Sequence, residues 1–97
     1  MATRRVPLAL LDIYVGPNCF GCDAAHAIAH EIQVLALPGV HIRVIDLGDP
    51  ANVRPASVFA VPTYLLNNRV LSLGNPEVDW LRDQLTNGRA ERLRDHE

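Results

Sequence analysis

The chain has 97 residues, 48% of them apolar, and a formal net charge of −2. A chain of this size and composition can bury a core of its own, so we predict one domain over residues 1–97, with its core at about 7–87 and a loosely ordered tail at 88–97. The charges are interspersed and form no basic face, which counts against a nucleic-acid partner.

The N-terminal segment contains Arg4 and Arg5 followed by an apolar run from Val6 to Leu11, which Asp12 interrupts. This run is too short for the hydrophobic region of a secretion signal or for a membrane span. We therefore expect a cytoplasmic protein without a membrane partner. In a reducing compartment, two close cysteines favour catalysis or metal binding over a structural disulfide.

The first half of the chain predicts a strand, a helix and a second strand. Residues 7–15 form an apolar run of strand length that ends at Gly16–Pro17. Residues 19–37 are rich in Ala and Leu with apolar residues at helical spacing, and residues 40–47 alternate like a strand. Such a unit places its two strands in parallel.

The second half predicts a hairpin and a last helix. Residues 49–59 form a short, proline-interrupted segment that is helical or irregular. Two short apolar strands in 62–73 flank Asn67–Asn68, a pair typical of a tight turn. Residues 76–85 begin with a proline and an acidic turn, as helices do. The predicted order is β-α-β-α-β-β-α, an α/β (α+β sandwich) fold with a four-stranded mixed sheet.

Three segments of this order resemble the thioredoxin and glutaredoxin family. "IYVGPNCFGCDAA" at 13–25 is similar to the strand and proline turn that lead into their C-x-x-C motif. "AVPTYLL" at 60–66 looks like their third strand, and "LSLGNPEVDWLRDQL" at 71–85 looks like the glycine turn before their last helix. The resemblance implies a thioredoxin-like fold and a redox-active disulfide in an enzyme of electron transport and cell redox homeostasis.

Cys19 and Cys22 are the only cysteines of the chain. Thiol–disulfide exchange needs a thiolate, and a helix start favours an anion, so Cys19 is the expected nucleophile and Cys22 the resolving thiol. Phe20, between them, is expected to be exposed and to contact the substrate. The resemblance also implies a cis bond before Pro62 and an extended substrate chain pairing with Val61.

The resemblance implies protein disulfides as substrates, a reductase or a low-molecular-weight thiol as electron donor, a monomer, and no metal or organic cofactor. Two family features are absent. Ile13 stands where thioredoxins bury a proton-relaying acid, and Asp12 should face the other side of the strand. Gly16 and Gly74–Asn75 stand where glutaredoxins hold glutathione, although a glutathione-coupled protein stays an alternative.

A metal- or cluster-binding module is the alternative from another functional class. Cys19, Cys22, His26 and His30 supply four soft or borderline ligands along one helix. Helical residues spanning two turns cannot all reach one ion, so a Cys19–Cys22–His26 site completed from elsewhere is the form to test. A pair of merely structural, buried cysteines is the remaining interpretation.

Overall fold

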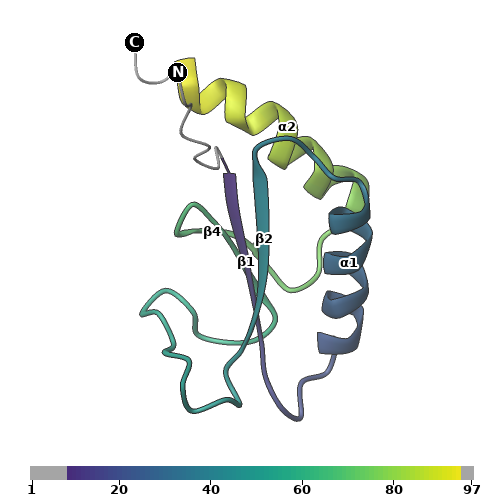
Figure 1. Cartoon of the computed structure of the whole chain (residues 1–97). Helices are drawn as coiled ribbons and strands as arrows, with labels where there is room; N and C mark the ends of the chain where they lie inside the picture. The colour runs from purple at the N-terminus through teal and green to yellow at the C-terminus, as the bar shows by residue number, and fades with distance from the viewer. Residues whose placement is uncertain (1–8, 95–97) are drawn as a thin grey trace, which may run out of the picture.

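The computed structural model describes the backbone of residues 9–94 and the side chains of residues 9–86. Two helices and four strands form a small α+β fold (Figure 1). In chain order the elements are β1 (Ala9–Val15), α1 (Cys22–Val34), β2 (Val40–Asp46), β3 (Thr63–Leu66), β4 (Arg69–Leu73) and α2 (Val78–Arg94). Neither helix in this part of the chain is long and apolar enough to cross a membrane.

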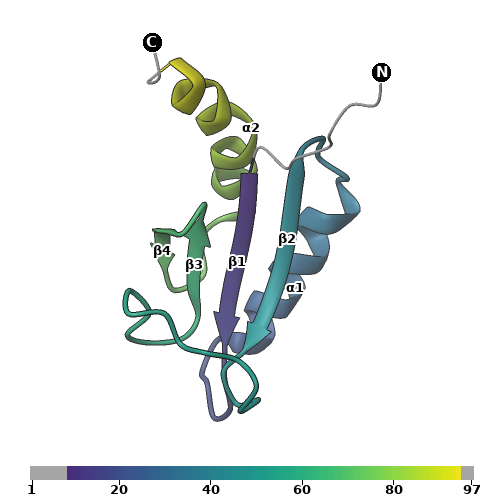
Figure 2. The same cartoon turned by 60° about the vertical axis from the view of Figure 1, so that its left-hand side comes forward.

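The four strands form one mixed sheet in the order β2-β1-β3-β4. β1 pairs in parallel with β2, and β3 pairs antiparallel with both β1 and β4 (Figure 2). The predicted four-stranded mixed sheet and its hairpin are confirmed. Asn67 and Asn68 form the hairpin turn with positive φ values of 51° and 70°, the backbone region that asparagine tolerates best after glycine.

The main core lies between the sheet and the two helices, which lie on the same side of the sheet (Figure 1). Leu11 and Ile13 of β1 pack there with Ile32 of α1 and Leu81 of α2. Alternate β1 residues face the other side, where Tyr14 packs with Val58 and Leu65 in a smaller cluster. β1 is therefore buried on both faces and forms the centre of the molecule.

The helix predicted between the second and third strands is absent, so the order β-α-β-α-β-β-α was wrong in that element. Residues 47–62 form turns instead, and they cover the side of the sheet that lacks helices (Figure 1). Pro50, Pro55 and Pro62 interrupt this stretch, and each removes an amide donor and disfavours helical geometry in the residue before it. Hydrogen bonds between near neighbours stabilise these turns: the Asp49 carboxylate accepts a hydrogen bond from the amide of Ala51 at 2.9 Å.

Both helices differ from their predicted limits. α1 begins at Cys22 instead of residue 19 and ends at Val34, where Ala36 takes a positive φ of 50° and Pro38 follows. α2 continues to Arg94, so helical backbone covers most of the segment 88–97 for which a loosely ordered tail is predicted. Residues 95–97, the rest of that segment, lie outside the described residues.

Candidate active site

Cys19 lies in the turn that connects the end of β1 to α1, and Cys22 is the first residue of α1; residues 16–22 are called the cysteine turn below. Cys19 and Cys22 are joined by a disulfide, with their Cα atoms 5.4 Å apart, inside the usual range for such bonds. Cys22 is only 6% exposed and belongs to the main core, whereas Cys19 is partly exposed and packs at the edge of that core. Cys19 is therefore the more exposed of the two cysteines.

Gly21 determines where α1 begins. Its φ of 102° is left-handed, a conformation that glycine adopts without the steric cost paid by other residues. The first α-helical bond runs from the Ala25 amide to the Gly21 carbonyl at 3.0 Å. Cys19 thus precedes the helix, contrary to its predicted place in the first turn. The disulfide nevertheless holds its sulfur against Cys22, the first helical residue, where the helix macrodipole is positive.

The segment Val61–Pro62 lies against this turn. The peptide bond before Pro62 is cis, as the family resemblance implied, and Pro62 is buried. A β-carbon placed on Gly21 would lie 4.0 Å from Pro62 Cδ, and one placed on Gly16 would lie 3.6 Å from Val61 Cγ2. Two segments about forty residues apart in the sequence therefore meet at the cysteines, and the substrate-binding role of Val61 and Pro62 stays a prediction.

Phe20 is fully exposed, as expected from its place between the cysteines. A phenyl ring in water forgoes the stabilisation that burial gives to large apolar side chains. Phe59 and Val53, in the loop 47–62, are also more than 80% exposed. These side chains are available for contact with other molecules, and the substrate role of Phe20 stays a prediction.

Asn75 joins the β4–α2 turn to the cysteine turn, a role that the sequence did not reveal. Its Nδ2 donates to the Gly21 carbonyl at 2.8 Å, and its Oδ1 accepts from the Tyr64 hydroxyl at 2.9 Å. The neighbouring Gly74 amide donates to the Pro62 carbonyl at 2.9 Å. The sequence did point to positions 74–75, but only because Asn75 stands where glutaredoxins have a second glycine. It did not indicate that the Asn75 side chain would contact the cysteine turn.

No protein-family model matches this chain, and no curated protein is significantly similar to it. The functional proposal therefore depends on the geometry of the site and on the sequence motifs that it contains.

Asp12 lies on the sheet face away from the cysteines, as its place one residue before Ile13 predicted. Asp12 is 2% exposed, and both of its carboxylate oxygens accept from the Arg43 guanidinium, at 2.7 and 2.8 Å. The hydrogen bond to Asp12 raises the pKa of Arg43, and burial raises the pKa of the neighbouring Tyr14. This ion pair joins β1 to β2 and does not reach the cysteine turn.

The metal alternative finds no preformed site in the described part of the chain. Among the side chains of residues 9–86, no group of three or more Cys, His, Asp or Glu is placed to hold an ion. His26 and His30 are exposed on α1, and both cysteines are engaged in the disulfide.

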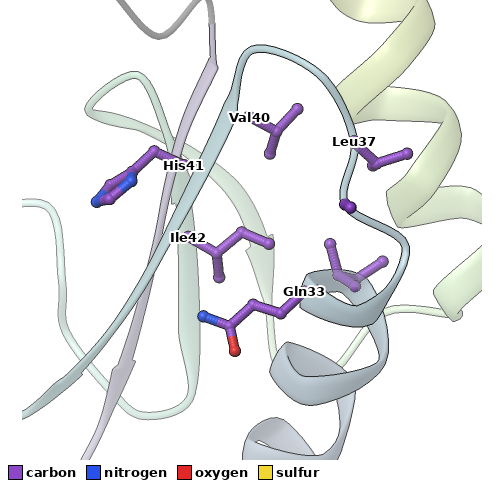
Figure 3. Close-up of a pocket in the computed structure, with 7 residues that line it drawn as sticks. Gln33, Leu37, Val40, His41 and Ile42 are labelled. Atoms are coloured by element: carbon purple, nitrogen blue, oxygen red, sulfur yellow. The ribbon is translucent and has the colours of Figure 1, made fainter.

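A shallow pocket lies at the other end of α1 (Figure 3). Gln33 lines it from the last turn of α1, Leu37 from the α1–β2 connection, and Val40, His41 and Ile42 from β2. Val40 is paired with Ala9 at the start of β1, whereas the cysteine turn follows the end of that strand. This pocket and the cysteines therefore lie at opposite ends of the sheet.

Proposed function

We propose that the protein is a thiol–disulfide oxidoreductase that acts on protein disulfides through Cys19 and Cys22. The observation that carries the proposal is the asymmetric disulfide: a partly exposed Cys19 bonded to a buried Cys22 at the start of α1. An exposed sulfur bonded to a protected one suits a reaction in which one thiol meets the substrate and the other completes the exchange.

The arrangement of the sheet supports a thioredoxin-like fold for this enzyme. A parallel β1–β2 pair, an antiparallel β3–β4 hairpin beside β1 and helices on one face of the sheet place the C-x-x-C turn next to Val61–Pro62. The turn segment 47–62 replaces the helix that the family resemblance implied. The proposed domain is therefore a smaller version of the thioredoxin-like fold, with two helices in the described residues.

The proposed reaction moves two electrons from the protein to the substrate. In the reduced protein, the Cys19 thiolate attacks one sulfur of a substrate disulfide, forms a mixed disulfide and releases the other substrate sulfur as a thiolate, which takes up a proton. Cys22 loses its proton and attacks Cys19, which releases the second substrate thiol. The Cys19–Cys22 disulfide of the structure is then the oxidised product of one cycle.

The surroundings of the pair favour an extended protein substrate. Phe20 offers an exposed aromatic surface beside Cys19, and Val61 offers backbone next to the same turn. We propose that an unfolded or extended chain lies between them, with a reductase or a low-molecular-weight thiol restoring the dithiol. In this proposal the protein works as a cytoplasmic monomer and needs no metal or organic cofactor.

A trapping experiment tests the proposal. In Cys22→Ser, Cys19 can attack but the resolving step is missing, so mixed disulfides with proteins should accumulate when the reduced variant is incubated with cell extract. Intact-mass analysis and non-reducing gels identify them. Cys19→Ser is the matched control, and it should capture little because the remaining thiol is buried.

Two results would contradict this function. Adducts consisting mainly of one glutathione would make the protein glutathione-coupled instead of a protein disulfide reductase. Absence of any adduct, together with stoichiometric zinc or iron in the freshly purified wild-type protein, would assign the cysteines to a metal site.

A further inference from the structure

The Asn75 side chain connects the buried core to the backbone of the cysteine turn. A backbone carbonyl only accepts hydrogen bonds, so the Asn75 nitrogen must face the Gly21 oxygen. The Asn75 oxygen must then face Tyr64, whose hydroxyl donates to it. The direction of both bonds is therefore fixed by chemistry: Tyr64 to Asn75 to Gly21.

Tyr64 anchors these two hydrogen bonds in the core. Its side chain is fully buried in the main core, in the centre of β3. Burial raises the pKa of Tyr64 to about 12, so its hydroxyl keeps its proton and stays a donor throughout the physiological range. Asn75 itself is exposed, so its orientation comes from these two bonds and not from packing.

The Gly21 carbonyl is the point at which the bonds reach the redox pair. It accepts from Asn75 and from the Ala25 amide, the first bond of α1. Gly21 is also the residue with the left-handed φ, which bends the chain between Cys19 and Cys22. Fixing this carbonyl fixes the Gly21–Cys22 peptide, one of the three peptide bonds between the two cysteines.

We propose that Asn75 is a positioning residue for the cysteine pair: it keeps the Cys19–Cys22 turn closed after reduction and so favours re-formation of the disulfide. When the covalent link is broken, the backbone of the turn is still held by hydrogen bonds, among them the long one from the Cys22 amide to the Cys19 carbonyl at 3.3 Å. Restricting the reduced turn lowers the entropy lost when the two sulfurs meet. This inference rests on the proposed function.

The reduction equilibrium of the pair measures this effect directly. Two glutathione molecules reduce the protein disulfide to two thiols and are themselves oxidised to one glutathione disulfide, so the equilibrium constant gives the effective concentration of one cysteine toward the other. We expect Asn75→Ala to lower that concentration about threefold to tenfold, the usual worth of one hydrogen bond. A tenfold loss makes the potential about 30 mV less negative.

Asn68→Ala is the matched control. It removes an exposed turn asparagine at the other end of the sheet and forces alanine into a positive φ, so it weakens the fold without touching the cysteine turn. The ratio of reduced to oxidised protein, measured by acid quenching, alkylation and mass spectrometry, should be that of the wild type. An equal shift in both variants would overturn the proposal, since it would reflect lost stability.

Tyr64→Phe keeps the ring in the core and removes only the hydroxyl that orients Asn75. It should shift the equilibrium in the same direction as Asn75→Ala and by less, and it decides the question if Asn75→Ala does not fold. Wild-type equilibria in both variants would show that the bonds hold the turn without favouring the disulfide, and the proposal would be wrong. If the wild-type pair itself exchanged no disulfide with glutathione, the proposed function would fail first and this inference with it.

Discussion

Cys19 and Cys22 are bonded to each other, yet their surroundings differ. Cys22 is held in the main core by α1, while Cys19 stands outside the helix with part of its surface in water. Gly21 produces this difference because its left-handed backbone delays the helix until after the first cysteine. The left-handed Gly21 thus lies between the partly exposed cysteine and the buried one.

The first prediction follows from this asymmetry. After reduction, iodoacetamide should alkylate Cys19 at least about tenfold faster than Cys22, because attack requires an accessible sulfur and a stabilised thiolate. The single-cysteine variants Cys22→Ser and Cys19→Ser give the two rates separately, followed by intact mass over time. Equal rates would remove the distinction between an attacking and a resolving thiol.

At the scale of the elements, the β1–α1 turn contains two glycines, of which only one needs the conformational freedom of glycine. Gly21 needs its positive φ, and a side chain there would also meet Asn75 at 3.4 Å. Gly16 has no positive φ, and a β-carbon on it would make an ordinary contact of 3.6 Å with Val61. The two positions therefore form a matched pair within one loop.

We predict that Gly21→Ala destabilises the oxidised protein by about 1–2 kcal/mol, the cost of a left-handed backbone in a residue with a β-carbon. Gly16→Ala should change the free energy of unfolding by less than about 0.5 kcal/mol, or stabilise the fold slightly by restricting the unfolded chain. Urea unfolding of both variants measures the difference. Similar values would mean that the Gly21 backbone relaxes without cost.

The sequence predicted the elements with a strong pattern and missed those fixed by single residues. β1 and the Asn67–Asn68 hairpin were recognisable because an apolar run of this length predicts a buried strand and an asparagine pair predicts a tight turn. The loop 47–62 was uncertain because its prolines argue against a helix while the family resemblance implies one. The start of α1 was misplaced because the periodicity of 19–37 contains no sign that Gly21 is left-handed.

The site was predictable to the extent that it lies in motifs. The C-x-x-C pair and the Val61–Pro62 segment could be placed together from the family resemblance. Asn75 could not, because its role depends on contacts with Tyr64 of β3 and Gly21 of the cysteine turn, and neither motif indicates that Asn75 would contact it. Hydrogen bonds between side chains of separate elements are set by tertiary structure, which no local pattern encodes.

Across the whole molecule, the core depends on two tyrosines whose pKa values burial raises, Tyr14 and Tyr64. A folded-state pKa above the usual 10 means that, as pH rises past 10, the unfolded chain loses these protons before the folded protein does. The unfolded state then binds fewer protons, and stability falls as pH increases. Below about pH 9 these groups contribute no pH dependence, because both states keep the proton.

We predict that the free energy of unfolding falls by about 1 kcal/mol between pH 9 and pH 11 through Tyr64 alone, with a further contribution from Tyr14. In Tyr64→Phe the decline over the same interval should be smaller by that amount. Urea titrations at pH 9, 10 and 11, with tyrosinate absorbance as a second readout, make the comparison. An identical decline in both proteins would show that Tyr64 ionises without opposing the fold.

The hairpin and the cysteine turn lie at opposite ends of the sheet, because β3 runs antiparallel to β1. All nine cations of the chain are arginines, so it contains no lysine side chain. Arg69, exposed at the start of β4 beside the hairpin, can become lysine with its charge retained. Arg69→Lys would give a single ε-amine for coupling a dye or a solid support, and the molecule would then present its cysteines outward from the anchored end.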